Sequence, residues 1–228
     1  MVTREAADSL ALGSIVEERV SRHPLAERLF HWTMAASVLT LLVTAFAPIL
    51  GWDFDWVTIH WIAGIVLTLA VLFHIVRAIF ILDFWSMMVD RDDLRNAWRG
   101  VTCTLLGAGP APSKPGKYPL MQKLFHWGMA GWLLVLIATG LLMLAKLDTP
   151  FWQRDPYWLS EFTWGIVYTI HGYFALTTIA LLMMHVYFAV RPDKIFLLRS
   201  MLLGWVSRRD YLDHHDPRRW TAEKAERS

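Results

Sequence analysis

Two pairs of histidines in this chain are separated by the same length of apolar sequence. His60 is followed after fourteen residues by His74, and His171 is followed after fourteen residues by His185. Fourteen residues make just under four helical turns, so the two imidazoles of each pair share one helix face about 21 Å apart along the axis. Two such helices side by side could clamp two planar ligands, one above the other. The spacing therefore predicts a protein that carries electrons across a membrane through stacked b-type haems.

The composition is that of a membrane protein. Of the 228 residues, 55% are hydrophobic and 13 are tryptophan, which is too apolar for an ordinary soluble domain. The net charge of +2 gives no basic footprint for nucleic acid. The single cysteine, Cys103, excludes a disulfide framework, a cysteine-rich iron–sulfur site and the covalent attachment of c-type haem. Any haem must therefore be held non-covalently.

Four apolar segments are long enough to cross about 30 Å of hydrocarbon. We expect them at about 30–50, 58–82, 124–145 and 164–189. Residues 1–29 are charged and do not resemble a signal peptide, so we expect a retained cytoplasmic lead-in. Residues 190–228 form a charged cytoplasmic tail, in which His214 and His215 are expected to be solvent-exposed or in contact with a partner. The whole chain is predicted to be one all-α integral membrane domain.

Lysine and arginine predict the orientation of the four segments. The lead-in holds four, residues 77–123 hold seven and the chain after residue 190 holds nine, whereas the first and third connections hold none and two. By the positive-inside rule, we expect a multi-pass membrane protein with both termini and the middle connection in the cytoplasm. His60 and His171 then lie toward the outer side. The other four histidines of the apolar segments, namely His31, His74, His126 and His185, lie toward the cytoplasm.

The two halves of the chain resemble each other. The stretch Arg28-Leu29-Phe30-His31-Trp32 returns as Lys123-Leu124-Phe125-His126-Trp127, and a Thr-Ile-His segment follows in each half. A parallel repeat of two hairpins implies a four-helix bundle with a pseudo-two-fold axis along the membrane normal, across which His60 faces His171.

Six imidazoles buried without a compensating partner would cost several kcal/mol, so a shared ligand is the economical explanation. The spacing fixes His60 and His171 as the outer pair but leaves the inner pair open. Symmetry alone would join His74 to His185. The alternative joins His31 to His185, and the symmetry mate of that pair is His126 with His74.

The chain resembles the gamma, or cytochrome b, subunit of membrane-bound formate dehydrogenase over most of its length. The match is carried by Phe30-His31-Trp32, His60, Gly64, Gly116-Lys117-Tyr118, Gln122-Lys123, Ile170-His171 and His185-Val186-Tyr187. The most specific part is the tail, which reads Gly204-x-Val206-Ser207-Arg208-Arg209 and then His214-His215-x-Pro217-Arg218-x-Trp220. Hydrophobic periodicity cannot account for these tail residues.

This resemblance implies two haems b, the outer one held by His60 and His171 and the inner one by His31 and His185. His74 and His126 stand where that family would have apolar residues, so they remain alternative ligands that could hold a third haem. The resemblance also implies a cytoplasmic pocket for menaquinone or ubiquinone lined by Tyr118 and Gln122.

Pro119 and Met121 depart from the family pattern beside that pocket, where Asn and Gly would be expected. At these two positions the contacts of the quinone site are therefore expected to differ from those of the family. The alternative role for Tyr118 and Gln122 is anchoring at the membrane interface.

The function implied by the resemblance is electron transfer and quinone reduction rather than formate oxidation itself. Electrons would come from an iron–sulfur subunit on the outer side, which a molybdenum or tungsten catalytic subunit supplies. Alternatives on the same scaffold are the cytochrome b subunits of nickel–iron hydrogenase, thiosulfate reductase or another quinone-linked complex. A histidine-lined transporter for zinc or copper is the alternative from another class. It would need Asp or Glu beside the imidazoles, and none of the four predicted segments has one in its interior.

Overall fold

Four long apolar helices make up most of the chain. The computed structural model describes residues 18–82, 84–107 and 109–221. The long helices are α2 (Leu25–Phe46), α3 (Trp56–Phe80), α5 (Leu120–Met143) and α6 (Glu161–Val190). Each is long and apolar enough to cross a membrane. The predicted all-α membrane fold is therefore confirmed. Of the predicted lead-in and tail, residues 1–17 and 222–228 lie outside the described residues.

All four long helices begin before the predicted apolar segments. α2 begins at Leu25 and α5 at Leu120, so Glu27, Arg28 and Lys123 are helical although they are charged. Helical hydrogen bonding continues past the apolar limit because charged side chains are compatible with a helix at the membrane interface. The start of α3 is set by Asp55, whose carboxylate accepts a hydrogen bond from the backbone N–H of Thr58 at 3.3 Å.

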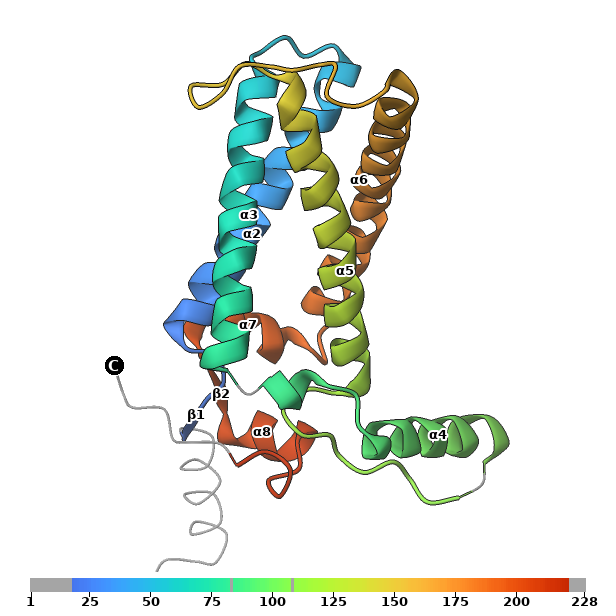
Figure 1. Ribbon diagram of the computed structural model, residues 1–228. Coiled ribbons are helices and arrows are strands. Elements are labelled where there is room, and N and C mark those ends of the chain that lie inside the picture. Colours follow the sequence, from blue (N-terminus) through green and yellow to red (C-terminus); the bar gives the residue numbers. More distant parts are fainter. Residues whose placement is uncertain (1–17, 83, 108, 222–228) are drawn as a thin grey trace, which may run out of the picture. The chain divides into compact units, whose positions relative to one another are not determined.

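The chain divides into two compact units. The helix unit contains residues 29–82 and 127–187, and the terminal unit contains residues 18–28, 84–126 and 188–221. Figure 1 shows the four long helices of the helix unit side by side, with the connections 47–55 and 144–160 at the same end. Two hairpins that turn at the same end agree with a parallel repeat. Short 3₁₀ helices, η1 (Pro48–Leu50) and η3 (Leu144–Lys146), lie in these connections.

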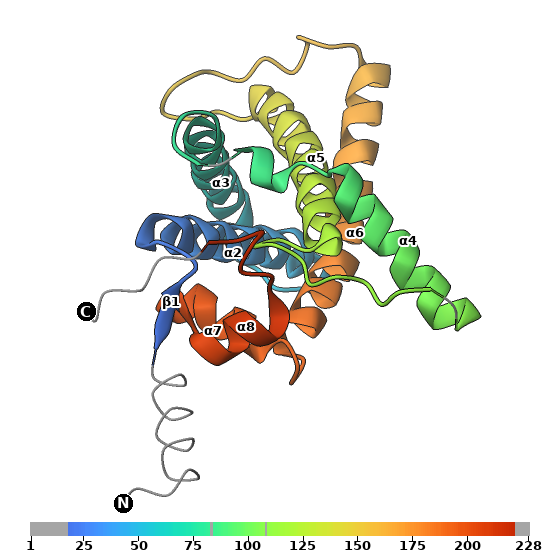
Figure 2. The same ribbon diagram turned by 90° about the horizontal axis from the view of Figure 1, so that it is seen from below.

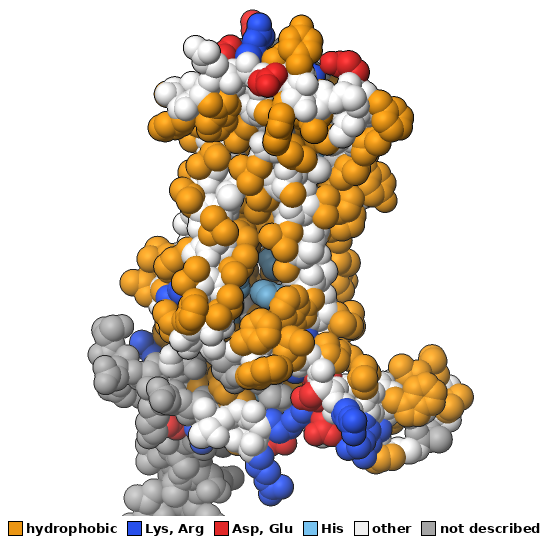
Figure 3. All heavy atoms as spheres, viewed as in Figure 1, with side chains coloured by type: hydrophobic (Ala, Val, Ile, Leu, Met, Phe, Trp, Pro, Cys, Tyr) orange, Lys and Arg blue, Asp and Glu red, His pale blue; other side chains and the backbone are white. Residues whose placement is uncertain are grey.

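The outer faces of the helix unit are apolar, whereas part of its interior is polar. Leu39, Val43, Leu69, Ile79 and Met183 are all more than half exposed, and hydrophobic side chains cover the middle of the face seen in Figure 3. In lipid such surfaces are satisfied by acyl chains. Four hydroxyl side chains of the same unit are at most 8% exposed, namely Ser37, Thr44, Thr139 and Thr178.

The terminal unit is built around a two-stranded antiparallel sheet. Strand β1 (Arg19–Ser21) pairs with β2 (Trp205–Ser207), and Val20 faces Val206 in the register. Helices α7 (Ile195–Leu203) and α8 (Arg208–His214) lie together next to this sheet (Figure 2). A small core of Val20, Phe196, Val206 and Tyr211 forms between them. The sheet therefore joins the chain before α2 to the chain after α6.

The residues of the tail that carry the family resemblance, between Gly204 and Trp220, have structural roles in the terminal unit. Gly204 ends α7 with a φ of +88°, and a Cβ there would lie 2.9 Å from the carbonyl oxygen of His23, so only glycine fits. Ser207 begins α8, because its hydroxyl accepts the backbone N–H of Asp210 at 3.1 Å. The ring of Trp220 packs edge-on against that of Tyr211 at a centre distance of 4.9 Å. The motif residues thus fold the tail against the strand before α2.

The expectation that His215 is exposed or bound to a partner was wrong. His215 is 2% exposed, its Nδ1 lies 2.7 Å from the carbonyl oxygen of Gly116, and its Nε2 lies 3.0 Å from Nη1 of Arg22. Since the guanidinium can only donate, Nε2 accepts and Nδ1 carries the proton. Burial, with the nearby Arg22 cation, lowers the pKa of His215 to about 4. Strand pairing, which the sequence did not reveal, brings Arg22 to this position. The ring of His214 packs on Phe196 at 4.4 Å.

The terminal unit also contains a helix that the sequence did not predict. A 3₁₀ helix, η2 (Phe84–Met87), is followed by α4 (Arg91–Leu106). A capping box between Asp90 and Asp93 begins α4. Asp93 also forms a buried ion pair with Lys123, with Nζ and Oδ2 2.6 Å apart. This pair joins the first turn of α4 to the first turn of α5.

Candidate haem site

His60 and His171 come together in the helix unit from α3 and α6. Their ring centres are 6.4 Å apart and their ring planes make an angle of 68°. A metal midway between two imidazoles, with bonds of about 2 Å to nitrogens about 1.1 Å from the ring centres, would separate those centres by about 6.2 Å. The spacing of this pair therefore fits two axial ligands of one iron.

His31 and His185 form a second pair, from α2 and α6. Their ring centres are 6.3 Å apart and their planes make an angle of 43°. Of the two inner pairings that the residues left open, the structure brings this one to the separation that suits a shared metal. α6 contributes one histidine to each pair, at positions about 21 Å apart along its axis. In Figure 3 histidine side chains, in pale blue, are visible among the hydrophobic ones.

The two remaining histidines of the apolar segments have different surroundings. The ring of His74 on α3 stacks on Phe30 of α2, with centres 4.3 Å apart and planes 7° from parallel. His126 is partly buried in the second turn of α5 and belongs to the terminal unit. The contact of His74 with Phe30 is that of aromatic packing.

Two buried threonines contact His60 and His171. The hydroxyl of Thr44 on α2 lies 2.8 Å from Nδ1 of His60, and the hydroxyl of Thr139 on α5 lies 2.8 Å from Nδ1 of His171. Sequence reasoning missed both residues. A signal was nevertheless present, because Thr44 follows His31 at the same interval at which Thr139 follows His126. The internal repeat therefore extends to the partners of the histidines.

Tyr118 and Gln122 lie in the terminal unit at the start of α5. The ammonium of Lys117 is 5.2 Å from the centre of the Tyr118 ring. Gln122 is half-buried, and its backbone N–H donates to the carbonyl oxygen of Pro119 at 2.9 Å in the first turn of the helix. Arg22 is close enough to Tyr118 for the two to interact electrostatically, although burial dominates and lowers the pKa of Arg22 to about 10. Both predicted quinone residues are thus partly exposed, and Tyr118 lies beside the cation of Lys117.

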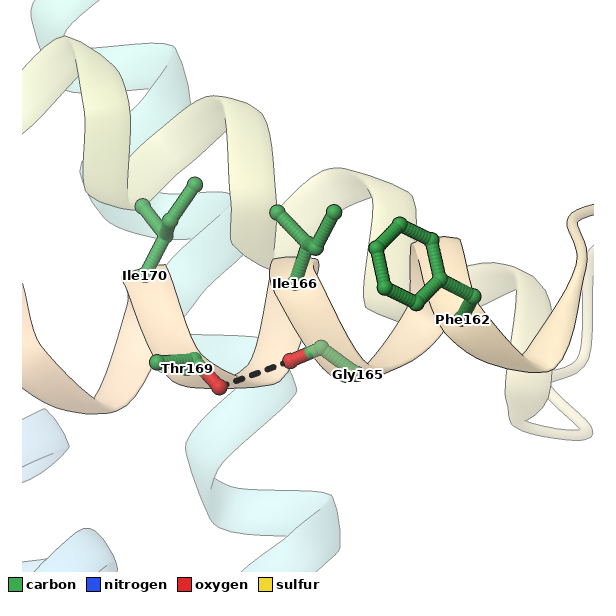
Figure 4. A pocket seen from close by; sticks show the side chains of 5 residues that line it. All are labelled: Phe162, Gly165, Ile166, Thr169 and Ile170. Atoms are coloured by element: carbon green, nitrogen blue, oxygen red, sulfur yellow. Dashed lines mark hydrogen bonds between the residues drawn. The ribbon is translucent and has the colours of Figure 1, made fainter.

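A groove of about 420 Å³ is lined by residues of α6 in its first turns. Figure 4 shows Phe162, Ile166 and Ile170 in a row along this helix. Thr169, from the second Thr-Ile-His motif, also lines the groove, and its hydroxyl donates to the carbonyl oxygen of Gly165 at 2.8 Å. The hydroxyl of this threonine therefore bonds to the backbone of its own helix. The partner of His171 is Thr139 on the neighbouring helix.

A bare metal ion would need a different set of ligands. Across the residues that the structure describes, no group of three or more His, Cys, Asp or Glu side chains could hold a metal ion. The histidines instead meet in twos on helices that can span a membrane, which suits a ligand that fills the remaining coordination positions itself. Haem supplies four ring nitrogens and leaves two axial positions for the protein.

The comparisons with known proteins agree with this geometry. The family described as prokaryotic cytochrome b561 matches residues 22–204. The chain is 26% identical over 221 residues to the formate dehydrogenase cytochrome b556 subunit of Haemophilus influenzae, and this match covers 91% of the chain and 84% of the relative. The resemblance to the cytochrome b subunits of formate dehydrogenases is therefore confirmed. Since the family match covers more than half of its length, the chain belongs to the prokaryotic cytochrome b561 family of haem b proteins.

Proposed function

We propose that this chain is the diheme cytochrome b subunit of a respiratory formate dehydrogenase. It takes electrons from an iron–sulfur subunit at the outer face of the bacterial inner membrane and delivers them to menaquinone or ubiquinone near the cytoplasmic face. The observation that carries the proposal is the presence of two histidine pairs with nearly equal ring separations, 6.4 and 6.3 Å, on spanning helices. The similarity to a formate dehydrogenase subunit supports formate as the electron source.

Each histidine pair has its own part in this function. His60 and His171 would hold the outer haem b, and His31 and His185 would hold the inner one. Haem b, when bound, supplies reversible one-electron chemistry. The helices fix the two ligand pairs at two depths and surround them with apolar side chains, which keeps water and competing reactions away. A third haem on His74 and His126 is not part of the proposal, because His74 packs flat against Phe30.

The distribution of positive charge supports the direction of electron flow. Arginine and lysine are concentrated in the termini and the middle connection, which supports an outer position for the connection of each hairpin. His60 and His171 then lie nearer the outer face than His31 and His185. Electrons that move inward, with protons taken up from the cytoplasm at the quinone, would build a membrane potential.

The quinone site is proposed at the start of α5, in the terminal unit. The Tyr118 hydroxyl and the Gln122 amide can donate hydrogen bonds to the two carbonyl oxygens of a quinone. Both residues are partly exposed there. Replacing Tyr118 by Phe and Gln122 by Met would leave the haem content unchanged and slow quinone reduction.

The proposed partners are an iron–sulfur subunit and a molybdenum or tungsten catalytic subunit. The experiment is to purify the intact complex from membranes through this chain and to add formate or hydrogen as donor. We expect formate to reduce the b-type absorption bands and the quinone, and we expect the His171→Ala complex to fail at quinone reduction. Reduction by hydrogen and not by formate would identify the chain as a hydrogenase subunit instead. No response to either donor would refute both assignments.

A further inference from the structure

We infer that Thr44 and Thr139 are a matched pair of positioning residues that fix the proton of the outer histidines and tune the haem bound between them. The inference rests on the proposed role of His60 and His171 as ligands. The two contacts are equivalent under the internal repeat, and each joins a histidine to the other helix of its own hairpin. α2 carries the partner of His60, and α5 carries the partner of His171.

The direction of the first contact follows from the hydroxyl proton of Thr44. Its oxygen lies 2.8 Å from the carbonyl oxygen of Thr40 and 3.1 Å from that of Leu41. A hydroxyl has one proton to donate, and carbonyl oxygens can only accept. The proton of Thr44 therefore goes to its own helix backbone. Toward His60 the same oxygen acts as an acceptor, so Nδ1 of His60 carries a proton.

The second contact repeats the first. The hydroxyl oxygen of Thr139 lies 2.7 Å from the carbonyl oxygen of Val135 and 3.1 Å from that of Leu136. Nδ1 of His171 is thus also the donor, at the same 2.8 Å distance. Thr44 is 2% exposed and Thr139 is 8% exposed, so solvent does not compete for either contact. The backbone carbonyls of Leu41 and Leu136 also accept from His60 and His171, which agrees with a proton on Nδ1 of each ring. Both outer imidazoles are held in the tautomer that leaves Nε2 unprotonated.

This tautomer is the one that an axial ligand needs. An unprotonated Nε2 can bind iron, while the bond from Nδ1–H to an acceptor orients the ring and makes the imidazole a stronger electron donor. A stronger donor stabilises the oxidised iron more than the reduced iron. The two threonines therefore lower the reduction potential of the outer haem. They also hold both imidazole rings in the required tautomer and orientation before the haem binds.

The test uses the full chain, loaded with haem, in potentiometric titrations followed by visible absorption. The titration step of the outer haem is called the outer wave, and that of the inner haem the inner wave. His60→Ala identifies the outer wave, because that variant should lose it. Thr44→Val and Thr139→Val remove only the hydroxyls, and Thr44→Ser and Thr139→Ser restore them. Thr40→Val is the matched control, because its hydroxyl donates to the carbonyl oxygen of Ala36 on the same helix, one turn from Thr44.

Each valine variant should shift the outer reduction equilibrium about tenfold toward the reduced form, or about +59 mV for one electron. The serine variants, Thr40→Val and the inner wave should stay at the wild-type potential. Loss of the outer haem in a valine variant that its serine counterpart retains would also support the inference. An unchanged outer wave in both valine variants would overturn it, as would haem loss in serine and valine variants alike.

The same titrations separate this inference from the proposed function. If His60→Ala keeps both waves, the ligand assignment fails and the threonine argument fails with it. If His60→Ala loses the outer wave while the valine variants titrate as the wild type does, the ligands stand and only the role of the threonines is refuted.

Discussion

The ring centres of His31 and His185 lie 6.3 Å apart, which is nearly the separation of His60 and His171. These two residues come from opposite ends of the spanning region of the sequence, and neither is the repeat equivalent of the other. Symmetry alone would have paired His185 with His74. The inner pair therefore breaks the symmetry that the outer pair obeys, and α6 contributes to both.

The first prediction concerns which histidines share a haem. Single replacement of His31 or His185 by Ala should abolish the same haem, because iron in this site loses one of its two axial ligands. Replacement of His60 or His171 should abolish the other. Redox titration of each variant, with haem measured per polypeptide, checks the pairing. Loss of a haem in His74→Ala with none lost in His31→Ala would overturn the inner pair.

A second prediction concerns His74. Because its ring stacks on Phe30 at 4.3 Å, a phenyl ring can replace it in nearly the same packing. His74→Phe should therefore keep both haems with unchanged absorption bands, and the stability of the protein should change by less than about 1.5 kcal/mol. Three haems in the wild type and two in this variant would show that His74 is a ligand after all.

The third prediction is a pH dependence of the tail. His215 has its pKa lowered from 6.5 to about 4 by burial and by the Arg22 cation, and His214 and Lys194 add smaller effects of the same sign. Between these two values the unfolded tail binds a proton that the folded tail does not, so stability falls as the pH falls through this range. The loss reaches at most about 3 kcal/mol below pH 4.

Amide hydrogen exchange of β2 and α8 at pH 7 and pH 4.5 measures this effect. We expect faster exchange at pH 4.5 after correction for the intrinsic rate. His215→Gln keeps an acceptor for Arg22 but does not titrate, so it should remove most of the difference, whereas His214→Gln should retain it. Equal pH dependence in His215→Gln and wild type would exclude His215 as the cause.

A fourth prediction concerns the buried ion pair between α4 and α5. Lys123→Met leaves the carboxylate of Asp93 buried without its cation and should lower the free energy of unfolding by about 3–5 kcal/mol. Arg95→Ala removes an exposed pair with Asp92 and should cost less than about 1 kcal/mol. Thermal unfolding in detergent compares the two. If the Lys123→Met protein were as stable as the Arg95→Ala protein, the loss of the cation beside Asp93 would not carry the cost expected of a buried ion pair.

The long helices and the approach of His60 to His171 were predictable because membrane spans obey strong constraints. Some twenty apolar residues in a row have few alternatives to a spanning helix, and the matched intervals to His74 and His185 mark one helix face. The inner pair was not predictable from spacing, since two pairings satisfied it equally. Resemblance to a family was needed to choose His31, and its ligand role remains a prediction.

Contacts between segments that are far apart in the chain could not be predicted from the sequence. Thr44 and Thr139 looked like ordinary helix residues, because a hydroxyl in an apolar span usually bonds to its own backbone. The burial of His215 depends on strand β1 pairing with β2, which are three residues each and too short to show an alternating pattern. α4 was missed because it is charged and, at 16 residues, shorter than a spanning helix, and its capping box at Asp90 was the available clue.

The most direct measurement of the central claim is the haem content of the purified wild-type chain, expressed with ample haem supply. The account predicts two non-covalent haems b per polypeptide, with reduced b-type bands, and one haem after replacement of His171 by Ala. A colourless protein, or one whose haem content is the same with and without His171, would contradict it.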